Sequence, residues 1–212
     1  MNKSHCNRRV WLAAGTAFSG ATLLSGLALP RRAHPQVPFG AVPRVTVMQA
    51  AELLASGGWI LMMRHEQTVP GVGDPPGFRL DDCSTQRNLS DQGRVRARRA
   101  GDVMRSAAIR LSLVRAGRWC RVRETAELAY GPFETWLALD SFFGQSERAP
   151  LHRDAVIEFA RGFTGAGNAM LVTHQVNITA ALEVVTEMGE VVAARFEGGQ
   201  LRPRLRFVPG SA

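Results

Sequence analysis

The sequence predicts an α/β protein whose central sheet is largely parallel. Short apolar runs alternate with longer segments whose apolar residues recur at helical spacing, over most of the 212 residues. This alternation is typical of crossover units, in which a helix joins two parallel strands. The runs at 59–63 and 169–173 are apolar on both faces, as in a buried parallel strand. With 45% hydrophobic residues the chain can bury a full core, and one domain is expected over 44–209.

Periodicity assigns the elements in chain order. Helices are expected at 47–55, 91–108, 119–129, 153–163 and 177–185, and strands at 59–63, 111–114, 135–139, 169–173, 191–196 and 201–208. The helices carry apolar residues three or four positions apart, whereas the strands are short apolar runs. Gly198-Gly199 separates the last two strands, which predicts a closing hairpin.

Local signals mark several helix ends. The first helix ends before Gly57-Gly58, a typical C-terminal stop, and Ser90 is a good N-cap for the second helix. Four residues of the second helix are expected to face the core: Val95, Val103, Met104 and Ala107. His152 precedes the fourth helix, outside any motif, and is expected at the surface.

The positive charge of the chain is concentrated at its start. The formal net charge is +8, and residues 1–35 contribute five basic residues and no acidic one. The remainder holds 21 basic and 18 acidic residues, a net charge of +3. That balance is ordinary for a soluble surface, so nucleic-acid binding is not expected.

Residues 1–35 are expected to be an export signal and the beginning of a tether. Arg8-Arg9 is followed by Trp11 and Leu12 and then by small and apolar residues, which resembles a twin-arginine signal. The sequence therefore predicts a periplasmic protein whose signal is cleaved and whose only membrane contact is that signal. The alternative is an uncleaved anchor, which a short run rich in Gly, Ser and Thr disfavours.

Cleavage would remove Cys6 and leave two cysteines, Cys83 and Cys120. In an exported protein such a pair can form a disulfide. A twin-arginine substrate folds in the reducing cytoplasm, however, and two cysteines can equally be small apolar core residues. Both possibilities stay open.

Three motifs place basic side chains at the ends of predicted strands. Arg64-His65 follows the first strand, Arg121 follows the second, and His174 follows the strand at 169–173. Separations of 56 and 53 residues between His65, Arg121 and His174 leave room for whole crossover units. Because ligands bind at the carboxyl ends of parallel strands, these side chains are expected to converge.

Two guanidiniums and two imidazoles suit a phosphoryl group. Arginine can bind two non-bridging oxygens at once, which lysine cannot. A neutral imidazole has a lone pair at neutral pH and can attack phosphorus. The segment 69–90, rich in glycine and proline, follows the first motif and is expected to form a wall of the active site.

The three motifs together resemble those of the histidine phosphatase superfamily, the phosphoglycerate-mutase-like proteins, over roughly residues 58–185. The likeness includes Thr125, four residues after Arg121, and the segment 86–93. The resemblance implies a three-layer α/β sandwich and a phosphohydrolase that cleaves phosphate monoesters through a phosphohistidine intermediate on His65. It also implies that no metal and no other cofactor is needed.

The resemblance assigns the phosphate-binding residues: Arg64, Arg121, His174 and Thr68. The two arginines would bind the non-bridging oxygens, and His174 would donate a further hydrogen bond as charge develops. At 100° per residue Arg123 points far from Arg121, so only one of them can face the pocket, and the spacing to Thr125 selects Arg121.

The first motif departs from the family at its third position, where Glu66 replaces the usual Gly or Ala. A carboxylate about 4 Å from a phosphate charge costs around 4 kcal/mol per unit charge at an effective dielectric of about 20. Glu66 is therefore expected to point away, to stay protonated or to have a role of its own. The general acid that protonates the leaving oxygen is expected to be Glu147, with Asp140 and Glu66 as alternatives.

The expected substrate is a phosphorylated small molecule, either a sugar phosphate such as one on envelope sugars or a broad range of phosphomonoesters. Two other classes compete with this hypothesis. The first is a catalytically silent phosphate-binding module, in which Glu66 marks the loss of turnover. The second is a cell-envelope scaffold with no phosphate affinity.

Overall fold

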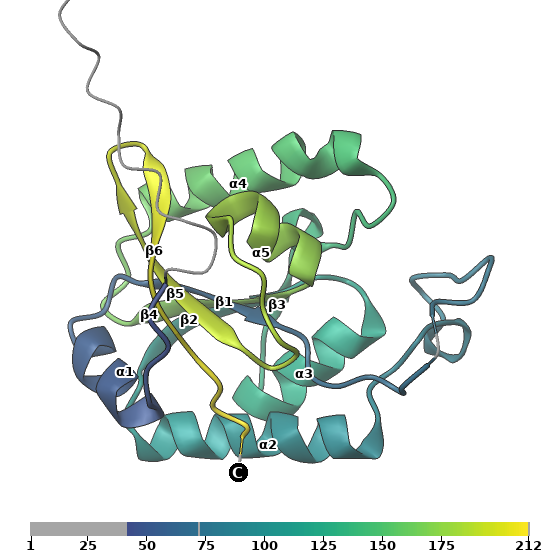
Figure 1. Ribbon diagram of the computed structural model, residues 1–212, viewed down its shortest axis with the longest axis horizontal. Coiled ribbons are helices and arrows are strands. Elements are labelled where there is room, and N and C mark those ends of the chain that lie inside the picture. The colour runs from purple at the N-terminus through teal and green to yellow at the C-terminus, as the bar shows by residue number, and fades with distance from the viewer. Residues whose placement is uncertain (1–41, 72, 212) are drawn as a thin grey trace, which may run out of the picture. The chain divides into compact units, whose positions relative to one another are not determined.

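The computed structural model describes residues 42–71 and 73–211. The predicted export signal, its tether and Cys6 lie outside these residues. The described part contains a six-stranded sheet in the order β3-β2-β4-β1-β5-β6 (Figure 1). The strands are β1 (Ile60–Arg64), β2 (Leu111–Ala116), β3 (Glu134–Thr135), β4 (Asn168–Thr173), β5 (Val191–Glu197) and β6 (Gln200–Phe207).

The central strands are parallel, as predicted. β4 pairs in parallel with β1 on one side and with β2 on the other, and β3 adds a short parallel strand at the edge of β2. β5 joins β1 antiparallel and forms the predicted hairpin with β6. The carboxyl ends of β1, β4 and β2 therefore lie side by side at one edge of the sheet.

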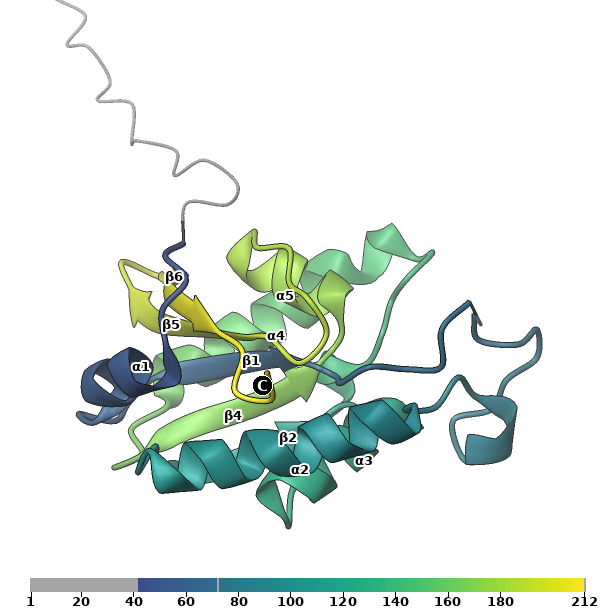
Figure 2. The same cartoon turned by 60° about the horizontal axis from the view of Figure 1, so that its bottom comes forward.

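Helices cover both faces of the sheet, which confirms the three-layer architecture. They are α1 (Val47–Leu54), α2 (Asp91–Ser106), α3 (Cys120–Tyr130), α4 (Ala149–Gly162) and α5 (Gln175–Leu182). α4 and α5 lie on one side of the sheet, and α2 and α3 lie on the other (Figure 2). Within the described residues, no helix is long and apolar enough to cross a membrane.

The apolar strand β1 is buried on both faces because it contributes to two cores. Leu61 and Met63 pack with residues of α1, α2 and α3. Ile60 and Met62 pack with residues of α4 and α5. Since successive side chains of a strand point to opposite faces, a strand between two helix layers must be apolar at every position.

Three elements differ most from their predicted bounds. The strand expected at 135–139 is reduced to β3, because after Thr135 the chain turns into a short 3-10 helix, Leu137–Leu139. α4 begins at Ala149 rather than at 153, with a proline in its first turn, where the missing N–H costs no hydrogen bond. α5 begins at Gln175, directly after His174, rather than at 177.

The buried face of α2 differs from the predicted one. Val95 is 57% exposed, and only Met104 of the four expected core residues is fully buried. The face turned inward is made mostly of small residues: Gly93, Ala97, Ala100, Gly101 and Met104. A Cβ added at Gly101 would lie 1.9 Å from the carbonyl oxygen of Ala129, so the close approach of α2 to α3 selects a small residue over a large apolar one.

His152 is buried, contrary to the prediction of a surface residue. Its side chain is 2% exposed, its Nδ1 lies 3.1 Å from the carbonyl oxygen of Ala138, and its ring packs on Phe142. The early start of α4 places His152 in the first turn of the helix, where it faces the core.

Candidate active site

The sheet register brings the first and third motifs together. Arg64 of β1 is paired with Thr173 of β4, so the residues that follow, His65 and His174, leave adjacent strands side by side. The backbone N–H of His65 continues the ladder by donating to Thr173 O at 2.9 Å. The two imidazole rings lie 5.3 Å apart, centre to centre, in an edge-on arrangement.

Arg121 joins this pair from the first turn of α3. Its guanidinium lies 4.5 Å from the centre of the Trp119 ring, and that ring lies 5.7 Å from the ring of His174. Arg121 is 3% exposed, whereas Arg123 is exposed, so the residue selected by the spacing to Thr125 is the one that points inward.

Thr125 connects the first two motifs directly. Its Oγ1 accepts a hydrogen bond from the backbone N–H of Glu66 at 3.1 Å and donates one to Arg121 O at 2.7 Å. All three residues are buried, so these hydrogen bonds do not compete with water. The residue four positions after the arginine therefore holds α3 against the segment that carries His65.

Arg64, at the end of β1, forms a basic cluster together with His65, Arg121 and His174. Its side chain is half-buried, and Nη1 donates to Thr186 O at 2.8 Å and to Gln175 Oε1 at 3.4 Å. Three nitrogen atoms of the cluster are buried and lack a hydrogen-bond partner in the described part of the chain: Arg64 Nε, Arg121 Nε and His174 Nε2. Buried polar atoms rarely stay unpaired, so a ligand with several acceptor oxygens would satisfy them.

Both imidazoles are neutral at neutral pH. Burial, followed by the charge of Arg121, lowers the pKa of His65 to about 3. Burial also holds the pKa of His174 well below its usual value, and His65 and Arg121 add to that shift. His65 Nδ1 lies 2.8 Å from the carbonyl oxygen of Glu66, which can only accept, so Nδ1 carries the proton. The lone pair of His65 is therefore on Nε2.

The carboxylate of Glu66 is engaged away from the histidines. It is fully buried, and Arg96 of α2 donates to its Oε2 at 3.0 Å. Burial raises the pKa of the Glu66 carboxyl, and the Arg96 guanidinium opposes that shift. Of the three expectations for this residue, the pair with Arg96 favours the first, a side chain that points away from the phosphate site.

The other predicted site residues lie in different settings. Asp140 is buried and binds Arg118 through both carboxylate oxygens, at 2.7 Å to the backbone N–H and 2.6 Å to Nη2. Glu147 is exposed in a short 3-10 helix, Ser146–Arg148, and its side chain makes no hydrogen bond or ion pair within the described residues. Thr68 is buried and forms a backbone bridge to Leu89. Their roles in catalysis stay predictions.

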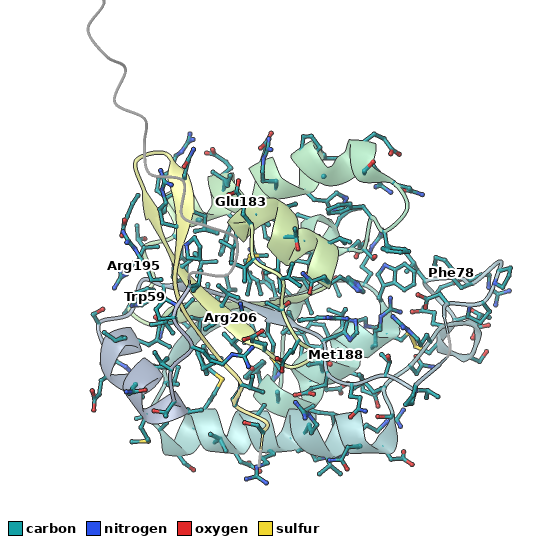
Figure 3. The ribbon with its side chains drawn as sticks, viewed as in Figure 1. Trp59, Phe78, Glu183, Met188, Arg195 and Arg206 are labelled. Atoms are coloured by element: carbon teal, nitrogen blue, oxygen red, sulfur yellow. A yellow bond between two sulfur atoms is a disulfide. The ribbon has the colours of Figure 1, made fainter. Side chains whose placement is uncertain are left out.

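The loop that follows the first motif is tied to α3. A disulfide joins Cys83 to Cys120, which settles the alternative that the sequence left open. Beside it, the backbone N–H of Cys120 donates to Gln86 Oε1 at 3.0 Å. The Phe78 ring of the same loop packs 4.4 Å from the ring of Trp119. Figure 3 labels Phe78 on this loop, on the opposite side of the molecule from Trp59.

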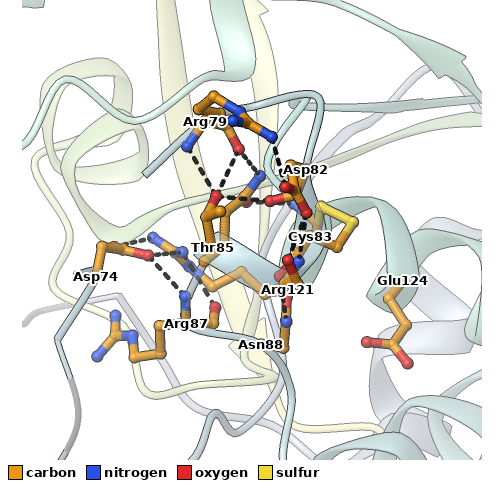
Figure 4. Close-up of a disulfide and its surroundings, with 12 residues drawn as sticks. Asp74, Arg79, Asp82, Cys83, Thr85, Arg87, Asn88, Arg121 and Glu124 are labelled. Atoms are coloured by element: carbon orange, nitrogen blue, oxygen red, sulfur yellow. Dashed lines mark hydrogen bonds and ion pairs between the residues drawn. A yellow bond between two sulfur atoms is a disulfide. The ribbon is translucent and has the colours of Figure 1, made fainter. Parts of the chain in front are cut away.

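Asp74 is the site residue that sequence reasoning missed. Its carboxylate forms a two-point ion pair with Arg121, at 2.8 Å to Nη1 and 3.1 Å to Nη2 (Figure 4). The only signal in the sequence was its position in the loop expected to line the site. No group of three or more His, Cys, Asp or Glu side chains that could hold a metal ion occurs among residues 42–71 and 73–211.

No protein-family model matches the sequence, and a comparison with curated proteins also finds no match. Solved structures do match the fold. The protein histidine phosphatase SixA, complexed with tungstate, has a TM-score of 0.50 at 12% identity, over 71% of this chain and 97% of its own. A putative α-ribazole-5′-P phosphatase from Escherichia coli has a TM-score of 0.51 at 14% identity, over 69% and 95% of the two chains.

A third similar structure is a mutant phosphoserine phosphatase from Entamoeba histolytica in complex with phosphoserine. Its TM-score is 0.52 at 9% identity, over 70% of this chain and 95% of its own. At such identities the likeness concerns the fold. The chain therefore has the fold of the histidine phosphatases, as the order and spacing of its motifs predicted.

Proposed function

We propose that this chain is a phosphohydrolase of the histidine phosphatase superfamily, acting on phosphate monoesters through a phosphohistidine on His65. One observation carries the proposal. Two neutral imidazoles and two guanidiniums converge at one edge of the sheet, and three of their buried nitrogen atoms lack a partner in the described part of the chain. A tetrahedral oxyanion supplies acceptors for such a cluster from several directions.

The chemistry follows from the protonation states. His65 Nε2 attacks phosphorus while Arg64, Arg121 and His174 stabilise the charge on the non-bridging oxygens. Water then attacks the phosphohistidine, and the electron pair of the P–N bond returns to Nε2. Removal of one such preorganised donor typically costs about 3–4 kcal/mol of barrier height. These side chains are expected to suffice without a metal ion, so activity should persist in a chelator.

The structural neighbours support the class of substrate. The SixA structure holds tungstate, and the phosphoserine phosphatase structure holds phosphoserine. A phosphorylated small molecule is therefore the proposed substrate, with an envelope sugar phosphate as one form of it. The disulfide supports a periplasmic location, because such bonds persist in oxidising compartments.

The decisive experiment compares two arginines of the same helix. We expect purified protein to hydrolyse 4-nitrophenyl phosphate, Arg121→Ala to lower kcat/KM by at least 10²-fold, and the exposed Arg123→Ala to leave it unchanged. His65→Ala should abolish turnover, and tungstate should inhibit the wild-type protein.

Three results would contradict the proposal. If both arginine variants lost kcat/KM equally, Arg121 would have no special role and the assigned site would be wrong. Phosphate or tungstate binding without turnover of any phosphomonoester would favour the silent binding module instead. If neither anion bound, the scaffold hypothesis would be the one left.

A further inference from the structure

One carboxylate is in direct contact with the guanidinium that is assigned to the phosphoryl group. Asp74 Oδ1 and Oδ2 bind the two terminal nitrogens of Arg121 at 2.8 and 3.1 Å. Arg121 still has an N–H at Nε, which is buried and lacks a partner in the described residues. A phosphoryl oxygen bound at Nε would therefore be a neighbour of Asp74 on the same guanidinium.

The carboxylates considered from the sequence are less suited to protonate a leaving group. Asp140 is paired with Arg118 and Glu66 with Arg96, and neither of these arginines belongs to the basic cluster. Glu147 is exposed, and its side chain makes no hydrogen bond or ion pair in the part of the chain that the structure describes. Asp74 alone among these four contacts a side chain of the basic cluster.

The loop holds Asp74 in place through a network that is anchored on α3. The backbone N–H of Arg87 donates to Asp74 Oδ1 at 3.1 Å, and Arg121 Nη1 also donates to Arg87 O at 3.3 Å. The Cys83–Cys120 disulfide fixes this loop beside Arg121 (Figure 4). The carboxylate is therefore positioned by covalent and hydrogen-bonded structure and is not a chance contact of a free loop.

We infer that Asp74 is the general acid of the phosphatase reaction, in a role that rests on the function proposed above. In the free protein the guanidinium of Arg121 neutralises the carboxylate. Once a dianionic phosphoryl group shares that guanidinium, like charges about 4 Å apart repel by roughly 4 kcal/mol per unit charge at an effective dielectric of about 20. The general-acid role requires the protonated form of Asp74, which does not repel the phosphoryl group.

The proton balance of both steps is complete. As the lone pair of His65 Nε2 forms the P–N bond, the P–O bond to the leaving group breaks and its electron pair stays on the oxygen. The Asp74 proton moves to that oxygen, which leaves as an alcohol. In the second step Asp74 accepts a proton from the attacking water, the P–N bond breaks, and inorganic phosphate is released with Asp74 protonated again.

The test compares Asp74→Asn with Glu147→Gln on two substrates in the full-length protein. Glycerol 2-phosphate has a poor alkoxide leaving group that needs an acid, whereas 4-nitrophenolate leaves as a stable anion. We expect Asp74→Asn to lower kcat/KM for glycerol 2-phosphate by about 10²–10⁴-fold and to change that for 4-nitrophenyl phosphate by much less. Glu147→Gln should leave the ratio of the two values as in the wild type.

Other outcomes overturn the assignment. An equal loss on both substrates in Asp74→Asn would mean that the residue only positions Arg121, and a selective loss in Glu147→Gln would make Glu147 the acid. Thermal unfolding and the inhibition constant for inorganic phosphate show whether Asp74→Asn keeps the fold and the anion site. If the wild type showed no His65-dependent hydrolysis of either ester, the phosphatase proposal itself would fail, and the acid role with it.

Discussion

The low pKa of His65 makes the stability of the protein depend on pH in a way that one substitution should remove. In the folded state burial lowers this pKa to about 3, whereas in the unfolded chain it is near 6.5. Below pH 6.5 the unfolded chain therefore binds a proton on His65 that the folded protein does not. The free energy of unfolding must then decrease as the pH falls from about 6.5 towards 3.

The size of the effect follows from the pKa difference. A shift of one pKa unit corresponds to about 1.4 kcal/mol, so the full contribution of His65 approaches about 5 kcal/mol at pH 3 and is about 2 kcal/mol at pH 5. At pH 7.5 it is close to zero. Because the residue is only 3% exposed, solvent screening reduces these values little.

The contribution of His65 can be measured by urea unfolding of the wild type and of His65→Gln, each at pH 7.5 and pH 5.0. The wild type should lose about 2 kcal/mol more than the variant between the two pH values, because all other titrating groups are shared. Equal losses in the two proteins would refute the reasoning. So would an NMR titration in which the His65 imidazole is protonated at pH 5.

Three further predictions concern the packing around the site. Replacing both Cys83 and Cys120 by Ala should lower the free energy of unfolding by about 4 kcal/mol in the chain-entropy model, since the bond spans 37 residues. The urea midpoint of this double variant is expected to equal that of the wild type after its disulfide has been reduced. Thr125→Val leaves the backbone N–H of Glu66, next to the proposed nucleophile, buried without an acceptor, which should cost about 1–3 kcal/mol and lower kcat; full stability would contradict the role of this hydroxyl. Gly101→Ala places a Cβ 1.9 Å from Ala129 O, so a loss of about 1–3 kcal/mol is expected by thermal unfolding, and no loss would mean that α2 and α3 separate easily.

Much of the fold could be predicted because local signals and tertiary structure agree. The apolar strands β1 and β4 lie between two helix layers, and the glycine pair between β5 and β6 forms the expected turn. The errors occur where packing overrides local pattern. On α2 the contact with α3 demands glycine and alanine, so the large residue Val95 faces solvent.

The residues of the candidate site could likewise be predicted only where local signals identify them. His65 and His174 could be placed together because parallel strands of one register end side by side, and the helical spacing to Thr125 picked out Arg121. Asp74 could not be found, because nothing local distinguishes one carboxylate of a long loop from another.

By itself the sequence determined the order of strands and helices and the basic side chains at the strand ends, and it predicted a phosphoryl ligand for them. Those features depend on residue type and on spacing within a few turns of chain. Only the tertiary structure decided which acidic side chain meets Arg121, whether His152 is buried, and whether the two cysteines are bonded. Each of these depends on the path of a loop or the start of a helix in space, and that path is set by contacts between residues far apart in the chain.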